Sequence, residues 1–128
     1  MERYDLGTVA IAPIDVILDR ERALIVQPDI LFVSRDRLSI IHEQVWGTPD
    51  LVAEVFSSGS EDYDRREKYG WYRHYGVREY WMIDAFRQEV IVNTFTGATP
   101  LVRVGGMPDL VPSRLLPTLA LKVSVLFA

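Results

Sequence analysis

The sequence predicts an α/β (α+β) domain in which a mixed β-sheet carries one main helix. Three β-prone runs lie at residues 30–33, 51–56 and 79–83, and the first two show almost no polar alternation, a pattern typical of strands buried on both faces. Residues 61–75, between the second and third runs, have the composition and boundaries of a helix. Because one helix stands between groups of strands, a mixed sheet is favoured over repeating βαβ units.

Composition limits the class of protein further. With 128 residues, of which 48% are hydrophobic and 25% charged, the chain is expected to form one domain over residues 1–128. No apolar stretch is long enough for a membrane helix and no signal peptide is visible, so we expect a soluble protein. The lack of cysteine excludes a disulfide scaffold and thiol catalysis, and it fits a cytoplasmic location.

The net charge of -4 argues against a general nucleic-acid binder, which usually has a basic surface. It does not exclude a metal-dependent nuclease, because the site of such an enzyme is itself built of carboxylates. Basic residues are also concentrated locally, at positions 65, 66, 68, 73 and 78.

The segments before the helix are expected to be mostly extended. Short strands are predicted at residues 8–12 and 15–18, with Pro13 at a kink or sheet edge, and residues 23–26 are predicted to be extended. Loops are expected at residues 19–22, 34–37, 47–49 and 57–60.

The helix over residues 61–75 has recognisable ends. Ser60 and Asp62 are both candidate N-caps, and Gly76 suits the left-handed position that ends a helix. After it, strands are predicted at residues 79–83, 89–95 and 101–104, whereas residues 115–127 fit either a helix or a strand.

Glu54 interrupts the apolar run of residues 51–56. A carboxylate there must be solvated, paired, protonated or bound to a metal, because burying a bare charge is very costly. A polar strand face or an arginine partner is one explanation. If residues 29–33 and 51–56 pair antiparallel, however, Asp29 lies about 5 Å from Glu54, whereas Asp50 is about 13 Å away along the strand. A cation between Asp29 and Glu54 would relieve their repulsion, and two carboxylates suit Mg²⁺.

The helix adds a possible cation to this pair. Asp64 and Lys68 are four residues apart, and Tyr72 continues the same face. The simplest reading of Asp64 and Lys68 is a weak surface ion pair, and the helix aromatics are most simply core residues.

No other motif suggests a catalytic site. His42 and His74 stand 32 positions apart with no motif around either, so we interpret both as structural or surface residues. The chain has neither the nucleophile elbow of hydrolases nor a glycine-rich phosphate loop.

Four ordered segments resemble the Uma2 (DUF820) family, a branch of the PD-(D/E)XK restriction endonuclease-like superfamily. They are QPDILFV, PDLVAEVFS, DRREKYGWY and GVREYWMID, and the similarity extends over about residues 8–127 with its specific core at 27–84. The resemblance implies a restriction endonuclease-like sheet and Mg²⁺-dependent hydrolysis of DNA, with Mn²⁺ as an alternative metal.

The resemblance also implies residue roles. Asp29, Glu54 and the main-chain carbonyl of Val55 would bind the metal. The superfamily usually has its lysine two residues after the acid, where this chain has Phe56, so Lys68 would supply that function from the helix. Gln27, Asp64 and Tyr72 would support the site, with Asp64 orienting Lys68 or reaching a metal-bound water.

Two departures from the family pattern leave a second reading open. Residues 57–60 read SSGS where the family usually has Ser-Pro-Ser-Thr, and the sequence begins almost at the first core strand, so we expect a domain truncated at its N-terminus, without the helical part that the resemblance implies there. A thinner helical layer would leave apolar sheet surface, which homodimerisation could cover. The alternative function is therefore a catalytically inactive family member that acts as a dimeric scaffold or partner-binding module.

Overall fold

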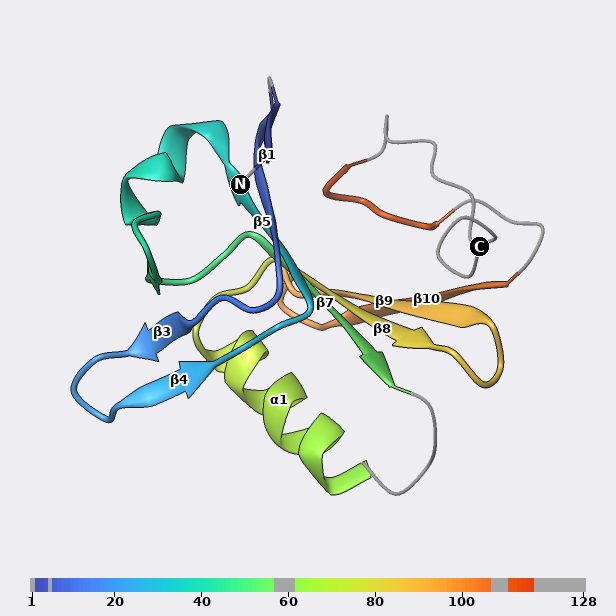
Figure 1. Cartoon of the computed structure of the whole chain (residues 1–128). Coiled ribbons are helices and arrows are strands. Elements are labelled where there is room, and N and C mark those ends of the chain that lie inside the picture. The colour runs from blue at the N-terminus through green and yellow to red at the C-terminus, as the bar shows by residue number, and fades with distance from the viewer. Residues whose placement is uncertain (1, 5, 57–61, 107–110, 117–128) are drawn as a thin grey trace.

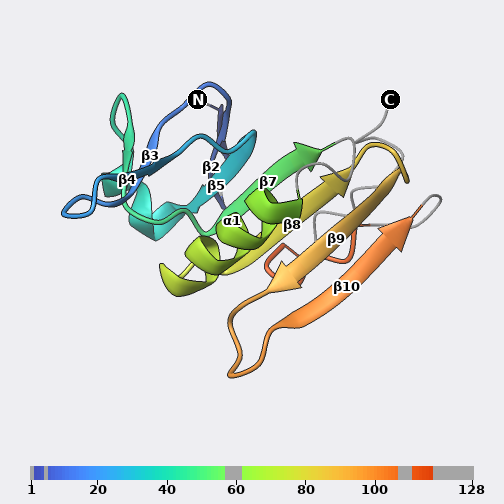
Figure 2. The same ribbon diagram turned by 90° about the horizontal axis from the view of Figure 1, so that it is seen from below.

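The computed structural model describes residues 2–4, 6–56, 62–106 and 111–116, with side chains from residue 6 onward except at 62–64. Its main feature is a seven-stranded mixed sheet with the order β1-β2-β5-β7-β8-β9-β10 (Figures 1 and 2). The strands of this sheet are β1 (Glu2–Tyr4), β2 (Gly7–Ile11), β5 (Ile30–Ser34), β7 (Leu51–Phe56), β8 (Glu79–Asp84), β9 (Glu89–Thr94) and β10 (Leu101–Gly106).

A second, three-stranded sheet with the order β4-β3-β6 lies beside the first. Its strands are β3 (Val16–Asp19), β4 (Leu24–Val26) and β6 (Val45–Trp46). The hydroxyl of Tyr75 donates to Asp19 Oδ2 at 2.7 Å, which fastens β3 to the end of the helix.

One helix, α1 (Asp62–His74), connects β7 to β8, which run parallel. It lies across one face of these two strands, as both views show (Figures 1 and 2). The predicted helix over 61–75 is confirmed within a residue at each end. Gly76 follows at a φ of 91°, the left-handed backbone that glycine adopts without strain.

Both faces of the central strands β7 and β8 are covered, as the largely apolar sequence of residues 51–56 predicted for β7. On the α1 face, Val52 and Tyr80 pack with Tyr72 of the helix. On the opposite face, Ala53 and Trp81 pack in a second cluster that includes residues from 111–116. The mixed sheet with few helices confirms the predicted fold class.

The structure differs from the prediction in several elements. Residues 34–37, predicted as a loop, belong largely to a 3₁₀ helix, η1 (Arg35–Ile40), because Leu38 and Ile40 pack against the core. Strands β1 and β6 were not predicted, since both are only two or three residues long, and β6 also depends on pairing with the distant strand β3. Asp62 lies inside α1 rather than capping it.

Some predictions fall outside the described residues. These are the loop at 57–60 with the candidate cap Ser60, and most of the 115–127 segment. In the part of the chain that is described, no helix is long and apolar enough to cross a membrane.

Candidate functional site

Strand pairing brings Asp29 and Glu54 together. β5 and β7 are antiparallel with Ile30 opposite Ala53, so the next position in this register sets Asp29 opposite Glu54. The predicted pairing is therefore confirmed. Asp29 Oδ2 also accepts a hydrogen bond from the backbone N–H of Val55 at 2.7 Å, which fixes this carboxylate against the end of β7.

The carboxylate of Glu54 points to the α1 face and is held from the helix at both oxygens. Lys68 Nζ lies 2.7 Å from Oε1, and the Tyr72 hydroxyl donates to Oε2 at 2.9 Å. Glu54 is only 6% exposed and Tyr72 is fully buried, whereas the Lys68 side chain remains 26% exposed. The cationic end of the cluster therefore faces solvent and its carboxylate faces the core.

Burial raises the pKa of the Glu54 carboxyl above its ordinary value, because the charged form loses water. The hydrogen bond and charge of Lys68 and the hydrogen bond of Tyr72 act in the opposite direction, and the nearby charge of Asp29 raises the pKa again. The two contacts from α1 do not fully offset the burial. An added cation near Asp29 and Glu54 would lower the energy of the ionised form.

The donor atoms at this point fit a hard divalent cation with few protein ligands. A strand residue directs its N–H and C=O to the same neighbouring strand. Because the Val55 N–H points to Asp29, its carbonyl is directed to the same side of β7. The described residues contain no group of three His, Cys, Asp or Glu that could hold a metal. Two carboxylates and one carbonyl match Mg²⁺, which keeps several waters.

The structure does not bring every predicted residue to this cluster. Gln27 is exposed, and its amide Nε2 donates to Asp15 Oδ1 at 2.5 Å. Asp64 lies in the first turn of α1, and its side chain is outside the described residues. His42 and His74 are both exposed, in agreement with the surface reading.

Two further buried carboxylates, Asp50 and Glu79, have structural contacts that could not be predicted from the sequence. Asp50 Oδ2 accepts from the Ser34 backbone N–H at 2.6 Å, and Arg37 and Arg78 lie 3.3 and 3.7 Å from its oxygens. It therefore ties β5 and η1 to the start of β8. The Pro-Asp dipeptide before β7 was visible in the sequence, but its partners are distant in the chain.

Glu79 is the other residue, and it is fully buried. Its oxygens accept hydrogen bonds from the Trp81 indole at 2.7 Å, the Ser113 hydroxyl at 2.5 Å and the backbone N–H groups of Arg114 and Leu115 at 3.0 Å. This carboxylate fastens residues 113–115 to the sheet face opposite α1. No local sequence signal identifies such a contact over more than thirty positions.

Comparison with known proteins decides the family. A family model named Uma2 and described as "Putative restriction endonuclease" matches residues 1–124. The chain belongs to the Uma2 family. No curated protein sequence is significantly similar to it.

A solved structure shares the fold of this Uma2 chain. It is a crystal structure from Anabaena variabilis ATCC 29413, described as "a putative nuclease belonging to DUF820". The TM-score is 0.73 at 19% identity, and the match covers 96% of this chain and 69% of that one. The resemblance of the four sequence segments to Uma2 is thereby confirmed at the level of family and fold.

Proposed function

We propose that this Uma2 protein is a Mg²⁺-dependent nuclease that hydrolyses phosphodiester bonds in DNA. One observation carries the proposal: Glu54, a buried carboxylate of raised pKa, lies opposite Asp29 and contacts Lys68. Two acids beside a lysine are better suited to the hydrolysis of a phosphodiester than to a purely structural role. The family description and the nuclease named for the structural neighbour support the same substrate class.

Each residue of the cluster has a defined part in this proposal. Asp29, Glu54 and the Val55 carbonyl would hold the metal ion. When bound, Mg²⁺ would polarise the scissile phosphate and lower the pKa of a bound water. The Lys68 ammonium, anchored on Glu54, would stabilise negative charge that develops on the phosphate. Tyr72 would keep the Glu54 carboxylate in one orientation through its hydroxyl.

A plasmid-nicking assay tests the proposal. Purified wild type is incubated with supercoiled DNA in Mg²⁺, Mn²⁺ or a chelator, beside Asp29→Asn, Glu54→Gln and Lys68→Met. Glu67→Gln is the matched control, because this acid lies on α1 outside the cluster. We expect nicking only with metal, and a loss of about 100-fold or more in each cluster variant.

The proposal fails if wild type does not nick DNA with either metal, or if Glu54→Gln nicks as fast as wild type. Circular dichroism of each variant confirms that a loss of nicking does not reflect unfolding.

The second candidate, a dimeric scaffold or partner-binding module, is favoured by the edge strand β10. Within the described residues β10 pairs only with β9, and it exposes the apolar side chains of Leu101, Val102 and Val104. Open strand edges of this kind pair readily with another chain. Sedimentation analysis of wild type and of Val102→Lys tests for homodimerisation, which we expect in wild type and not in the variant. A monomeric wild type excludes the dimer.

A further inference from the structure

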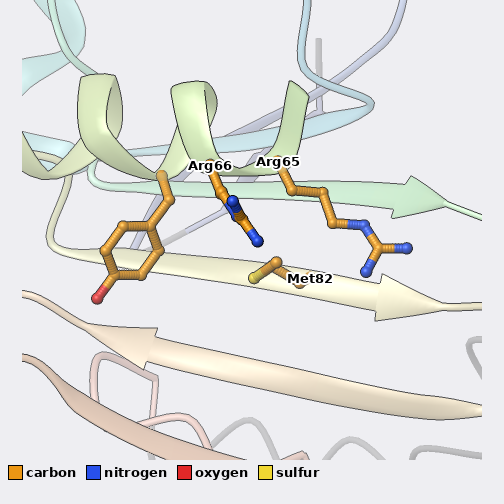
Figure 3. Close-up of a pocket in the computed structure, with 4 residues that line it drawn as sticks. Arg65, Arg66 and Met82 are labelled. Atoms are coloured by element: carbon orange, nitrogen blue, oxygen red, sulfur yellow. The ribbon is translucent and has the colours of Figure 1, made fainter. Parts of the chain in front are cut away.

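A cavity of about 380 Å³ lies between α1 and β8. Its described lining consists of Arg65, Arg66 and Tyr69 of the helix and Met82 of the strand. Figure 3 shows Arg66 reaching from α1 towards Met82 of β8, while Arg65 extends to one side along the strands. The volume is in the range of sites that hold small ligands or parts of larger ones.

The cavity borders the Glu54 cluster directly. Met82 is the register partner of Glu54 on the neighbouring strand β8, and adjacent strands are about 4.8 Å apart. Arg65 precedes Lys68 by three positions, so their Cβ atoms are about 5–6 Å apart on one helix face. Asp29 lies on the opposite side of Glu54, on β5. The cavity is therefore the continuation of the candidate site on the side away from Asp29.

The two arginines differ in contact and exposure. The Arg65 guanidinium lies over the Phe56 ring, 3.5 Å from its centroid, so a cation–π contact fixes it beside the cavity. Arg66 is exposed and can adjust to a ligand. Tyr69 is held by an edge-to-face contact with Phe95 at 5.1 Å between centroids. One fixed cation, one adaptable cation and an aromatic wall make a cavity suited to an anion that carries an apolar group.

A nucleic-acid strand has this chemistry, with phosphates for the guanidiniums and sugars or bases for the tyrosine and methionine. A free inorganic anion would use only the arginines. The chain as a whole carries a net charge of -4, so its general field does not attract DNA. Binding of a DNA strand would therefore depend on local basic residues such as these.

We propose that this cavity binds a phosphate of the DNA strand next to the phosphate that is cleaved. The assignment rests on the proposed nuclease function, since it names the contact that positions the strand over Glu54 and Lys68. Neighbouring phosphates of one strand could occupy the two places because the cavity and the Glu54 cluster are adjacent, with Met82 opposite Glu54 in the sheet and Arg65 one helical turn from Lys68.

Fluorescence anisotropy with labelled DNA in a chelator tests this contact without cleavage. The variants are Arg66→Gln and the double variant Arg65→Gln/Arg66→Gln. Arg73→Gln is the matched control, an exposed arginine on the same helix. We expect the double variant to bind about tenfold more weakly, with the slope of log K against log salt smaller by about 1–2, and the control to change little. Arg66→Gln alone, at an exposed position, should show part of the loss with the fold unchanged.

The outcomes separate this contact from the nuclease proposal. Unchanged affinity and salt slope in the double variant overturn the cavity assignment, even if wild type nicks plasmid. An absence of DNA binding by wild type overturns it as well. Weaker binding in the double variant with no nicking by wild type supports the DNA contact and refutes the nuclease. If the DNA contact and the nuclease activity are both correct, Arg65→Gln/Arg66→Gln should raise KM more than it lowers kcat.

Competition distinguishes the polymer from a free nucleotide. A nucleoside monophosphate is expected to displace labelled DNA only at concentrations far above those of unlabelled DNA. Displacement at equal concentrations would overturn the assignment of the cavity to a strand.

Discussion

Replacing Lys68 with Met tests whether the ammonium stabilises a buried carboxylate. At 2.7 Å and an effective dielectric constant of about 20, two unit charges attract by about 6 kcal/mol. The net loss is smaller, because the Lys68 side chain is 26% exposed and its charge is partly solvated. Removing one partner of a fully buried pair costs about 3–5 kcal/mol, so for this pair we expect about 2–3 kcal/mol near pH 8.

The pH dependence is the specific signature of this pair. The folded-state pKa of Glu54 is already raised by burial, and it rises further without Lys68. A carboxyl with a raised folded pKa contributes stability that is fully present below its unfolded pKa and is lost as pH rises through the folded pKa. In Lys68→Met the stability contributed by protonated Glu54 is therefore lost at a higher pH than in wild type. The decrease in the free energy of unfolding caused by Lys68→Met should accordingly be smaller near pH 5 than near pH 8.

Urea unfolding followed by tryptophan fluorescence at about pH 5 and pH 8 measures this difference. Arg73→Met is the control, because it removes an exposed charge from the same helix. In a Glu54→Gln background, Lys68→Met should lower the free energy of unfolding by under about 1 kcal/mol. The difference between the two backgrounds measures the interaction between Lys68 and the Glu54 charge. Equal costs at the two pH values, or equal costs with and without the Glu54 charge, would refute the reasoning.

Three other changes have defined outcomes. Glu79→Gln puts an amide N–H₂ group among the donors from Ser113 and residues 114–115, and should lower the free energy of unfolding by about 3 kcal/mol in urea. Gly7→Ala places a Cβ 2.1 Å from the Val33 carbonyl oxygen, and should cost about 2 kcal/mol in the same assay. Mg²⁺ at tenfold its Kd should stabilise wild type by about 1.4 kcal/mol, seen as a rise in Tm of a few degrees, and should leave Asp29→Asn unchanged. A chelator should reverse the rise in Tm.

The parts of the fold that could be predicted are those with a local signal. Apart from Glu54, the run at residues 51–56 is apolar on both faces, and this pattern is enough to indicate a central strand. The helix is marked by its composition and by Gly76. Even the proximity of Asp29 and Glu54 followed from a simple antiparallel register, because both residues lie at the ends of recognisable strands.

The parts that could not be predicted depend on contacts between distant segments. The 3₁₀ helix at Arg35–Ile40 forms because Leu38 and Ile40 pack against the core. The polar residues around them in the sequence instead indicate a loop. Glu79 looks like the polar first residue of a strand, and only the folded position of residues 113–115 explains its burial. Arg65 and Arg66 were visible as basic residues, but the cavity beside them exists only when α1 lies on β8.

The buried carboxylates of the described residues differ in a way that bears on function. Asp50 and Glu79 are each surrounded by hydrogen-bond donors or cations, and they join segments of the fold. Glu54 also has a cation and a hydroxyl donor, Lys68 and Tyr72 of α1, but it differs from the other two in facing a second carboxylate. Burial beside Asp29 raises its pKa, so this placement works against the ionised form. A purely structural role would be served as well by Gln, which keeps an oxygen acceptor for Tyr72 without the charge. Lys68 already favours the charged acid, but burial still keeps the pKa of Glu54 raised, and the proposed metal ion between Asp29 and Glu54 would supply the remaining stabilisation of the charge.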